Sequence, residues 1–309
     1  MATLRQLIHF LATHHLKRRY RIGLIVGVTV ILIVAIASIG VHALKRPAAA
    51  SSSSAVIKIA KLPDPTVSLQ TYLNSLEQTG KVQVSFYSLA PKPGSKAAKQ
   101  RSGALDRKGG VKVAAGGDTK VYSASTYKLY IAAYVFHRYA QGKLPWDLTD
   151  RQNFDAMIVN SENGYAQTIL TRYGNDTVDN YLQTIGIDPA FAGDAAETTA
   201  NNLVKILKLL DAGQGPFAND KMRTRLLKDM GKQVYRQGIP AGVASVDKHA
   251  KVQDKVGFLT NTNNDAGIVT TKDGHRYILV IMTTGHAQLD FSQIKEIAAH
   301  IQRLVYEAA

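Results

Sequence analysis

Residues 125–136 read STYKLYIAAYVF, and this stretch decides how the chain is interpreted. The apolar run predicts a helix whose first turn carries a hydroxyl, Ser125, and an amine, Lys128, on one face, because residues three apart are neighbours on a helix. A serine becomes an effective nucleophile when an adjacent base takes its proton. Lysine is such a base only when neutral, so burial or a second cation must lower its pKa from about 10.4. A capped helix with a solvated lysine is the plainer alternative.

Composition limits the classes of protein that fit. The chain has 309 residues, 45% hydrophobic and 20% charged, which is enough for one large domain or two small ones. It has no cysteine, which excludes disulfides, thiolate catalysis and cysteine-ligated zinc. The net charge is +15, from 38 Lys and Arg against 23 Asp and Glu. This excess favours anionic partners such as lipid headgroups, acidic wall polymers or nucleic acid.

The N-terminal region predicts a membrane anchor. Residues 22–44, IGLIVGVTVILIVAIASIGVHAL, contain no Asp, Glu, Lys or Arg and at 1.5 Å per residue can cross the ~30 Å hydrocarbon core. A cleaved signal peptide is the alternative, although its apolar region would run only about 7–15 residues. The basic segment 1–21 favours a cytoplasmic N-terminus, which places the rest of this single-pass protein outside the cell membrane. Residues 45–65 predict a low-complexity linker, and 66–309 a single domain.

Periodicity orders the elements of that domain. Apolar spacing predicts a helix over 67–76, and alternation predicts a strand over 82–89, with a second strand that ends near Val121. The intervening segment 91–110, rich in Lys, Arg and Gly, predicts an exposed, mobile hairpin extension. Further elements are expected as helices over 125–136, 155–170, 178–185 and 199–210, a hairpin over 267–282 and a closing helix over 291–306.

This order of elements predicts the fold class. Helix, strands, helical block, strands and helix indicate an α/β (α+β) domain in which an antiparallel sheet is flanked by terminal helices and joined to an all-helical subdomain. Thr198 or Thr199 is expected as the N-cap of the helix over 199–210, since threonine is favoured there.

Two further motifs follow the first in chain order. They are Ser161-Glu162-Asn163, after helical 157–159, and Lys255-Val256-Gly257, ahead of a predicted strand pair. S-x-x-K, S-D-N and K-T-G together are the signature of class A β-lactamases and penicillin-binding proteins. From about residue 66 to the C-terminus the chain therefore resembles the class A β-lactamase-like serine hydrolases. The resemblance implies the β-lactamase/transpeptidase-like form of the fold above and needs no cofactor.

The resemblance implies a role for each residue of the first two motifs. Ser125 would be the acylated nucleophile, with Lys128 as its proton acceptor. Ser161 would relay a proton to the leaving nitrogen, and Asn163 would hold Lys128 and an amide of the substrate. Glu162 replaces the usual aspartate, and we expect it to make structural hydrogen bonds away from the substrate.

The third motif would complete the site. By the resemblance, Lys255 would lower the pKa of Lys128 and attract a substrate carboxylate. Gly257 would line the substrate site, and the N–H groups of Ser125 and Phe258 would form an oxyanion hole. Val256 stands where the family usually has a hydroxyl, and losing a hydrogen bond to a charged group costs about 1.5–3 kcal/mol. We therefore expect penicillin-like carboxylates to be held weakly.

A second departure concerns deacylation. Class A β-lactamases carry an E-x-x-L-N glutamate that activates water, and no such pattern lies between residues 163 and 198. The corresponding segment, 186–197, is short, and its acids are Asp188, Asp194 and Glu197. Any of these could position a water, although a carboxylate beside a helix start, such as Glu197, ordinarily serves the helix dipole.

Three functions remain open. The first is a membrane-anchored extracytoplasmic serine hydrolase, acylated at Ser125 by β-lactams or by related amides such as cell-wall peptides, with slow deacylation. The second is a true β-lactamase with a different water-activating group. The third is a weakly catalytic or non-catalytic envelope-binding domain in which Lys92–Lys112 binds anionic wall polymers, although a solvated loop is the favoured interpretation of this segment. Nucleic acid is not expected outside the cell. No metal-ligand spacing links the histidines His137, His249, His275 and His286.

Overall fold

The computed structural model describes residues 64–100 and 103–307. The segments predicted as a cytoplasmic flank, a transmembrane helix over 22–44 and a linker lie outside this part of the chain, apart from the last two linker positions. Within the described residues, no helix has the length and apolarity that a membrane crossing requires.

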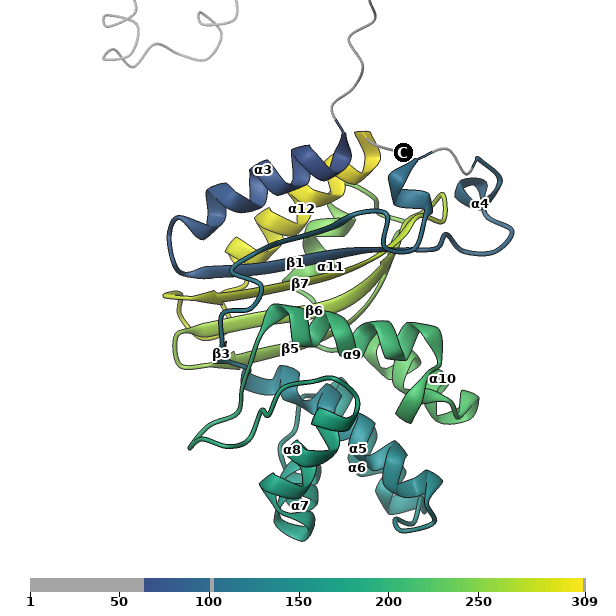
Figure 1. The fold of residues 1–309 in the computed structure, drawn as a ribbon, viewed down its shortest axis with the longest axis vertical. Coiled ribbons are helices and arrows are strands. Elements are labelled where there is room, and N and C mark those ends of the chain that lie inside the picture. Colours follow the sequence, from purple (N-terminus) through teal and green to yellow (C-terminus); the bar gives the residue numbers. More distant parts are fainter. Residues whose placement is uncertain (1–63, 101–102, 308–309) are drawn as a thin grey trace, which may run out of the picture. The chain divides into compact units, whose positions relative to one another are not determined.

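Five antiparallel strands form the main sheet, in the spatial order β2-β1-β7-β6-β5 (Figure 1). The strands are β1 Val82–Leu89, β2 Lys112–Ala115, β5 Lys251–Leu259, β6 Thr262–Thr270 and β7 Arg276–Thr284. β7 lies at the centre and is covered on both faces, which explains its nearly continuous apolar sequence. β5 lies at an edge, so one side of its backbone is available to a substrate.

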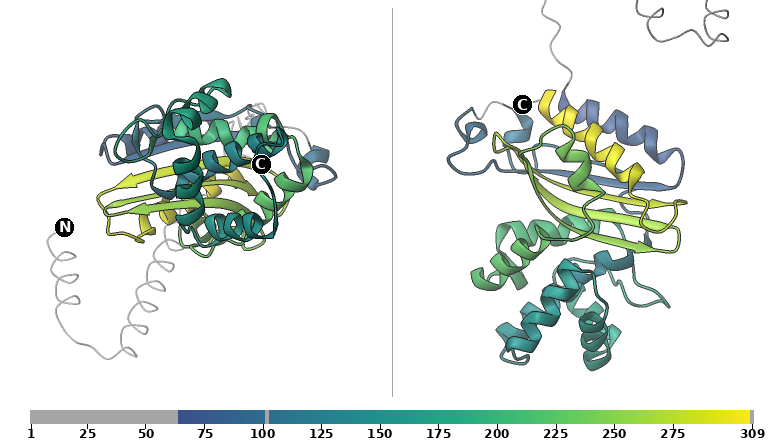
Figure 2. Two further views of the ribbon diagram at one scale, coloured as in Figure 1. Left: turned by 90° about the horizontal axis from the view of Figure 1, so that it is seen from below. Right: turned by 180° about the vertical axis from the view of Figure 1, so that it is seen from behind.

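Three helices cover one face of the sheet. α3 (Pro65–Glu77), α11 (Ile239–Ala244) and α12 (Ser292–Glu307) lie together there (Figures 1 and 2). Their apolar side chains form one core with Val84 and Phe86 of β1. Tyr87 and Leu89 of the same strand belong to a second core on the opposite face, because successive side chains of a strand point to opposite sides.

The second face carries the helical part of the domain. α9 (Ala200–Ala212) packs on β1, β6 and β7. The remaining helices are α5 Lys128–Ala140, α6 Leu148–Val159, α7 Gly164–Tyr173, α8 Asn175–Thr184 and α10 Asp220–Met230. α5 is buried along nearly its whole length, as its apolar sequence predicts. Thr199 is the N-cap of α9, where its side chain accepts a hydrogen bond from the Asn202 N–H.

The predicted α/β architecture is therefore confirmed, with three local corrections. No strand of the main sheet ends near Val121: β2 ends at Ala115, and β3 (Val121–Tyr122) pairs instead with β4 (Glu197–Thr198) in a separate ribbon. The helix predicted over 155–170 is two helices, because the chain turns between α6 and α7 at Ser161, whose φ is +62°. α10 and α11 were not predicted, because the apolar residues in each extend over too short a stretch to show a helical repeat.

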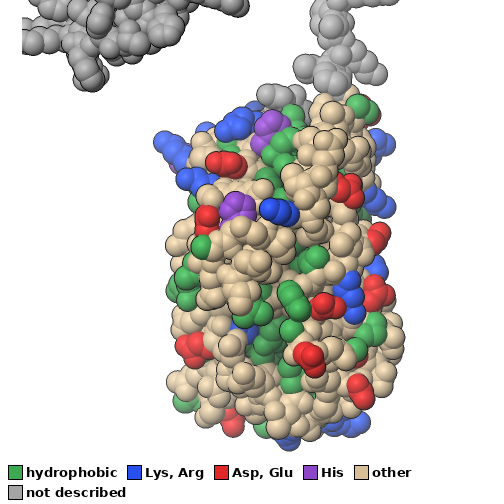
Figure 3. Space-filling view, turned by 90° about the vertical axis from the view of Figure 1, so that its left-hand side faces the viewer, with side chains coloured by type: hydrophobic (Ala, Val, Ile, Leu, Met, Phe, Trp, Pro, Cys, Tyr) green, Lys and Arg blue, Asp and Glu red, His purple; other side chains and the backbone are tan. Residues whose placement is uncertain are grey.

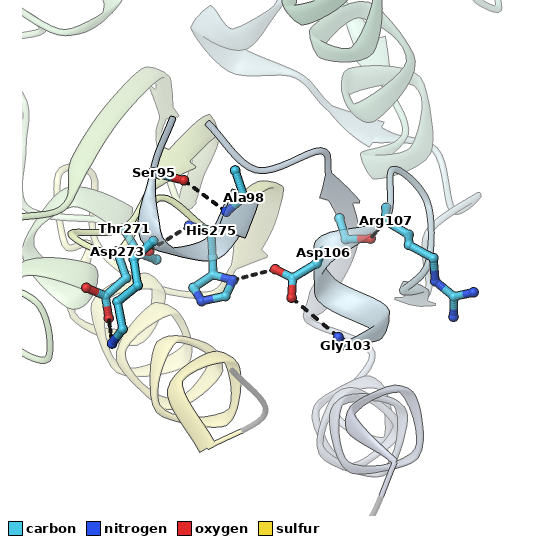
Figure 4. A network of polar contacts seen from close by, with 10 residues as sticks. Ser95, Ala98, Gly103, Asp106, Arg107, Thr271, Asp273 and His275 are labelled. Atoms are coloured by element: carbon cyan, nitrogen blue, oxygen red, sulfur yellow. Dashed lines mark hydrogen bonds and ion pairs between the residues drawn. The ribbon is translucent and has the colours of Figure 1, made fainter. Parts of the chain in front are cut away.

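The third correction concerns the predicted extension over 91–110, whose described residues, 91–100 and 103–110, fold back onto the protein instead of extending from it. They form α4 (Lys96–Gln100) and the 3-10 turn η1 (Ala104–Asp106). Leu105 is buried, and Asp106 accepts a hydrogen bond from His275 Nδ1 at 2.9 Å (Figure 4). The segment is thus attached to the turn between β6 and β7, a long-range contact that its composition does not reveal.

Two carboxyl groups are completely buried where β5 and β6 meet α11. Asp254 accepts a hydrogen bond from Arg236 at 2.7 Å, and Asp265 accepts one from the Ile239 N–H at 2.8 Å. Burial raises the pKa of Asp265 to about 7 and, together with the charge of Asp265, raises the pKa of Asp254 well above its usual range. The folded protein therefore binds protons here more tightly than the unfolded chain.

We expect Asp254→Asn to flatten the dependence of stability on pH. Because the folded-state pKa values are raised, the stabilisation is complete below about pH 4 and is lost as the pH rises towards 7 and above. With one carboxyl removed, the loss in free energy of unfolding between pH 4 and 8 should be smaller than in the wild-type protein. Urea unfolding, followed by the fluorescence of Trp146, measures this. Asp220→Asn, at an exposed position, is the control; matching profiles for all three proteins would contradict the expectation.

Candidate active site

Ser125 lies in the 3-10 turn η2 (Ala124–Tyr127), which leads directly into α5. The preceding residue, Ala124, has a φ of +42°, a conformation that costs a non-glycine residue about 1–3 kcal/mol and is concentrated at functional sites. Neither Ser123 nor Ser125 caps the helix through its side chain, so the plainer interpretation of the motif does not hold. The backbone instead presents the Ser125 side chain at a half-buried position.

Lys128 is completely buried and connects the first motif to the second. Its Nζ lies 2.9 Å from Ser125 Oγ, 2.6 Å from the Ser161 carbonyl oxygen and 2.7 Å from Asn163 Oδ1. When the amine is neutral, two N–H groups can donate to Ser161 and Asn163 while the lone pair accepts the Ser125 hydroxyl proton. Burial lowers the pKa of Lys128 to about 8, against a smaller opposing effect of the Glu162 carboxylate. About one tenth of the amine is then neutral at pH 7.

Ser161 lies between the two lysines of the site. Its carbonyl oxygen accepts from Lys128, and its Oγ accepts from Lys255 Nζ at 2.7 Å. The positive φ of Ser161 turns its side chain and its carbonyl oxygen towards different partners. Glu162 is exposed and accepts from Asn160 Nδ2 at 3.2 Å, a contact outside the hydrogen bonds of Lys128.

Lys255 is completely buried and donates to Ser161 Oγ and to the Val256 carbonyl oxygen at 2.9 Å. Burial lowers its pKa well below the usual value, and the charge of Lys128 lowers it further, while Asp254 and Asp265 raise it. Since repulsion between two ammonium groups is mutual, a proton on either lysine makes protonation of the other more costly. Burial, however, is the first cause of the lowered pKa of Lys128.

Gly257 brings the edge strand β5 against the nucleophile. A Cβ at this position would lie 2.8 Å from the backbone nitrogen of Ser125 and 2.8 Å from the Ser123 carbonyl oxygen, closer than real Cβ contacts allow. The two-residue turn after Leu259 makes Leu259 and Thr262 a hydrogen-bonded pair, so the N–H of Phe258 points away from β6 towards the free edge. The two predicted oxyanion-hole donors, the N–H groups of Ser125 and Phe258, therefore come from η2 and β5, which adjoin at Gly257.

The hydroxyl that the family usually has in its third motif has no counterpart at Val256. The side chain of Val256 is fully buried in the core beneath α11 and α12, on the sheet face opposite Lys255. It therefore offers no polar group to the site.

Sequence reasoning missed Asn264, which holds the chain just before the nucleophile. Its Nδ2 donates to the carbonyl oxygens of Tyr122 and Ser123, at 2.9 and 3.1 Å, and its side chain is completely buried. The signal was present as the polar run NND over 263–265 inside a strand that should be buried, since a buried amide must find partners.

The segment 186–197 packs an aromatic ring beside the first motif. The carboxylate of Asp179 accepts hydrogen bonds from the N–H groups of Ala190 and Phe191, and the Phe191 ring meets the Tyr127 ring edge-on at 5.6 Å. Of the three acids, Asp188 accepts from Asn202 at 3.0 Å, Asp194 is exposed and Glu197 is part of β4. In the described residues, no acid of this segment contacts the Ser125 or Lys128 side chain.

The described residues offer no candidate metal site. Over residues 64–100 and 103–307, no three side chains of His, Asp or Glu gather as metal ligands would.

Solved structures share this fold. A structure of PBP-A is 20% identical, covers 80% of this chain and 96% of its own, and superposes with a TM-score of 0.60. A class A β-lactamase from Bacteroides cellulosilyticus DSM 14838 is 16% identical, with 79% and 98% covered and a TM-score of 0.60. A variant of the class A β-lactamase of the last common ancestor of Gram-negative bacteria is 20% identical, with 78% and 97% covered and a TM-score of 0.59. No curated protein sequence matches the chain.

The sequence itself provides the family assignment. The beta-lactamase enzyme family matches residues 146–309, more than half of the chain. This range contains the second and third motifs, which the hydrogen bond from Lys255 to Ser161 connects. Ser125 and Lys128 precede the range, and the hydrogen bonds of Lys128 join them to the second motif. The resemblance drawn from the three motifs is thereby confirmed: the chain belongs to the beta-lactamase enzyme family, and its fold is similar to that of class A β-lactamases.

Proposed function

We propose that residues 66–309 form a serine hydrolase domain that β-lactams, or related amide and peptide substrates, acylate at Ser125, and that the acyl group then leaves slowly. The observation that carries the proposal is the 2.9 Å contact between Ser125 Oγ and a buried Lys128 amine whose pKa is about 8. One structural neighbour, a PBP-A mutant, is an acyl-enzyme complex with penicillin G, which supports acylation as the shared reaction.

In the proposed acylation, neutral Lys128 takes the proton of Ser125, whose Oγ attacks the carbonyl carbon of the substrate. The N–H groups of Ser125 and Phe258 stabilise the developing oxyanion. When the C–N bond breaks, Ser161 gives its hydroxyl proton to the nitrogen and recovers one from Lys255 through their 2.7 Å contact. Lys128 gains a proton as Lys255 loses one, so the pair of lysines carries one positive charge before and after the step.

The surroundings of Tyr127 support the proposal of slow deacylation. The Lys128 amine lies 5.9 Å from the centre of the Tyr127 ring, and the Phe191 ring packs against that ring. The rings of Tyr127 and Phe191 provide no basic group that could take a proton from a hydrolytic water. The glutamate that activates water in class A β-lactamases, which stands in the pattern E-x-x-L-N, is absent from residues 163–198.

We further propose that residues 22–44 anchor the protein in the cell membrane by a single span, with a cytoplasmic N-terminus and the hydrolase domain outside. The support is the uncharged length of this segment and the basic residues that precede it. In that location, cell-wall peptides are the substrates within reach.

A mass-spectrometric time course with a penicillin tests the reaction at Ser125. We expect a covalent adduct that persists for many minutes in the wild-type protein and is absent in Ser125→Ala, because among the described residues Ser125 has the only hydroxyl that hydrogen-bonds with the Lys128 amine. The exposed Ser245→Ala is the matched control and should label normally. Absence of adduct at high penicillin concentration contradicts acylation, and an adduct that turns over within seconds favours a true β-lactamase instead.

The same reaction with a fluorescent penicillin tests the location. Labelled full-length protein should sediment with membranes, whereas a variant without residues 1–60 should label equally well and stay in the supernatant. Labelled full-length protein in the supernatant would count against the anchor.

The rate of acylation should depend on pH through Lys128. Because only the neutral amine accepts the Ser125 proton, the second-order rate constant should rise about tenfold per pH unit up to about pH 8 and then level off. At pH 6 it should be about a hundredfold below the plateau. Stopped-flow measurements with a β-lactam of fixed charge between pH 6 and 9 give this profile. Lys128→Arg, which stays protonated, should form no adduct; a flat wild-type profile would exclude Lys128 as the base.

Gly257→Ala tests the oxyanion hole. The added methyl group meets the backbone of Ser123 and Ser125, so β5 and η2 must separate and one N–H donor loses its position. Loss of one such donor slows acyl transfer by about 10²–10³, and the acylation rate should fall by that factor. At Gly231, where a Cβ meets nothing closer than 3.4 Å, the alanine variant should react normally. Wild-type acylation of Gly257→Ala would show that this contact does not position the donors.

A further inference from the structure

Two adjoining cavities lie at the end of β5 and β6 that is remote from Ser125. One, of about 570 Å³, lies between residues 92–96 and the turn 270–274. The other, of about 600 Å³, lies between the start of β5 and the end of α10. Both are lined by Lys92, Lys251 and Thr270, so they form one continuous depression, here called the lysine groove. Lys251 precedes Gly257 by six residues, or about 20 Å along the strand.

The groove is strongly positive. Its two linings together contain six lysines: Lys92, Lys96, Lys228, Lys232, Lys251 and Lys272. They contain one acid, Asp273, which pairs with Lys96 at 3.3 Å. By contrast, on the face of the protein seen in Figure 3, lysine and arginine side chains lie intermingled with acidic ones. The groove differs from that face in having six lysines against one acid.

The arginines of the groove already have partners, but most of its lysines do not. Arg236 pairs with the buried Asp254 at 2.7 Å, and Arg276 pairs with Asp211. Lys92, Lys228, Lys232 and Lys251 are exposed and form no ion pair with any other described residue. The counter-charge closest to these lysines is Asp229, which interacts electrostatically with Lys232 without forming an ion pair. Like charges that converge with so few ion pairs repel one another, and a polyanion would relieve this repulsion.

The walls of the groove are held in place by hydrogen bonds. The Lys92 N–H donates to the Gly274 carbonyl oxygen and the Ala97 N–H to the Asp273 carbonyl oxygen, both at 2.9 Å. His275, directly after the turn, forms a buried hydrogen bond with Asp106 of η1, which holds the turn from a second segment (Figure 4). Because these walls are already ordered, little conformational entropy remains to be lost when a ligand binds.

The chemistry of the lining selects among polyanions. Lysine ammonium groups act as point charges suited to phosphate oxygens, while planar carboxylates are better matched by free arginines, which the groove lacks. Neither lining contains Phe, Tyr or Trp, and His249 is the one aromatic side chain in them, so successive nucleic-acid bases would have no row of rings on which to stack. Two joined cavities accommodate a chain with successive charges better than a single small anion.

We propose that the lysine groove binds a linear phosphodiester polymer without bases, of the polyol phosphate type, at a site separate from Ser125. In this proposal the lysine groove, and not the whole segment Lys92–Lys112, binds the anionic polymer. From that segment only Lys92 and Lys96 line the groove. The other four lysines come from β5, the β6–β7 turn and the region of α10. Binding would hold the hydrolase beside its anionic surroundings without using the catalytic residues.

The test measures binding of the full-length protein to a poly(glycerol phosphate) of about ten repeats. The double variant Lys92→Glu with Lys251→Glu should bind about tenfold more weakly or worse, and wild-type affinity should fall steeply as salt rises, because phosphate contacts release counterions. Lys81→Glu with Lys143→Glu changes the net charge equally at exposed lysines that line neither cavity, and should bind normally. Unchanged Trp146 unfolding curves confirm that both variants fold. Ser125→Ala should bind like the wild type, which separates this test from that of acylation.

Each other outcome overturns the proposal. Equal weakening in both double variants would mean that only net charge matters. Competition by glycerol 3-phosphate at equal phosphate concentration would mean a site for a small phosphate. Tighter binding of a single-stranded oligonucleotide with the same number of phosphates would mean a nucleic-acid site, and absence of polymer binding at low salt would mean no such site.

Discussion

The structure of the site depends on one buried amine. Lys128 Nζ contacts Ser125 Oγ, the Ser161 carbonyl oxygen and Asn163 Oδ1, and these three groups come from η2 and from the turn between α6 and α7. Burying an ammonium group is costly unless hydrogen bonds satisfy it, and the same cost makes the neutral base accessible near pH 8. The buried Lys128 amine therefore both connects the α6–α7 turn to the nucleophile and supplies the base of the proposed reaction.

Backbone geometry is the second constraint. Ala124 and Ser161 both adopt positive φ values, and Gly257 lets the edge strand approach the nucleophile more closely than any side chain would permit. These features are local departures from favourable conformations, and the two apolar cores on either side of the sheet stabilise them. Asn264 adds a buried polar contact that fixes the carbonyl groups just ahead of Ser125.

Prediction from sequence was most accurate where periodicity was long. The buried α5, the alternating β1 and the β6–β7 hairpin were predicted because many residues repeat one pattern. Prediction failed at residues 91–110 and at Val121, since the partners of these segments, His275 and β4, lie far away in the chain. A pattern read over a dozen residues contains no information on such pairings.

By itself, the sequence determined the fold class, the order of the three motifs and the absence of the E-x-x-L-N glutamate, because each depends on residue type and local spacing. Only the tertiary structure decided that Lys128 and Lys255 meet at Ser161, that burial rather than a second charge chiefly lowers the pKa of Lys128, and that lysines from separate elements line one groove. Desolvation and charge convergence depend on what surrounds a group in space, and packing between distant segments creates those surroundings.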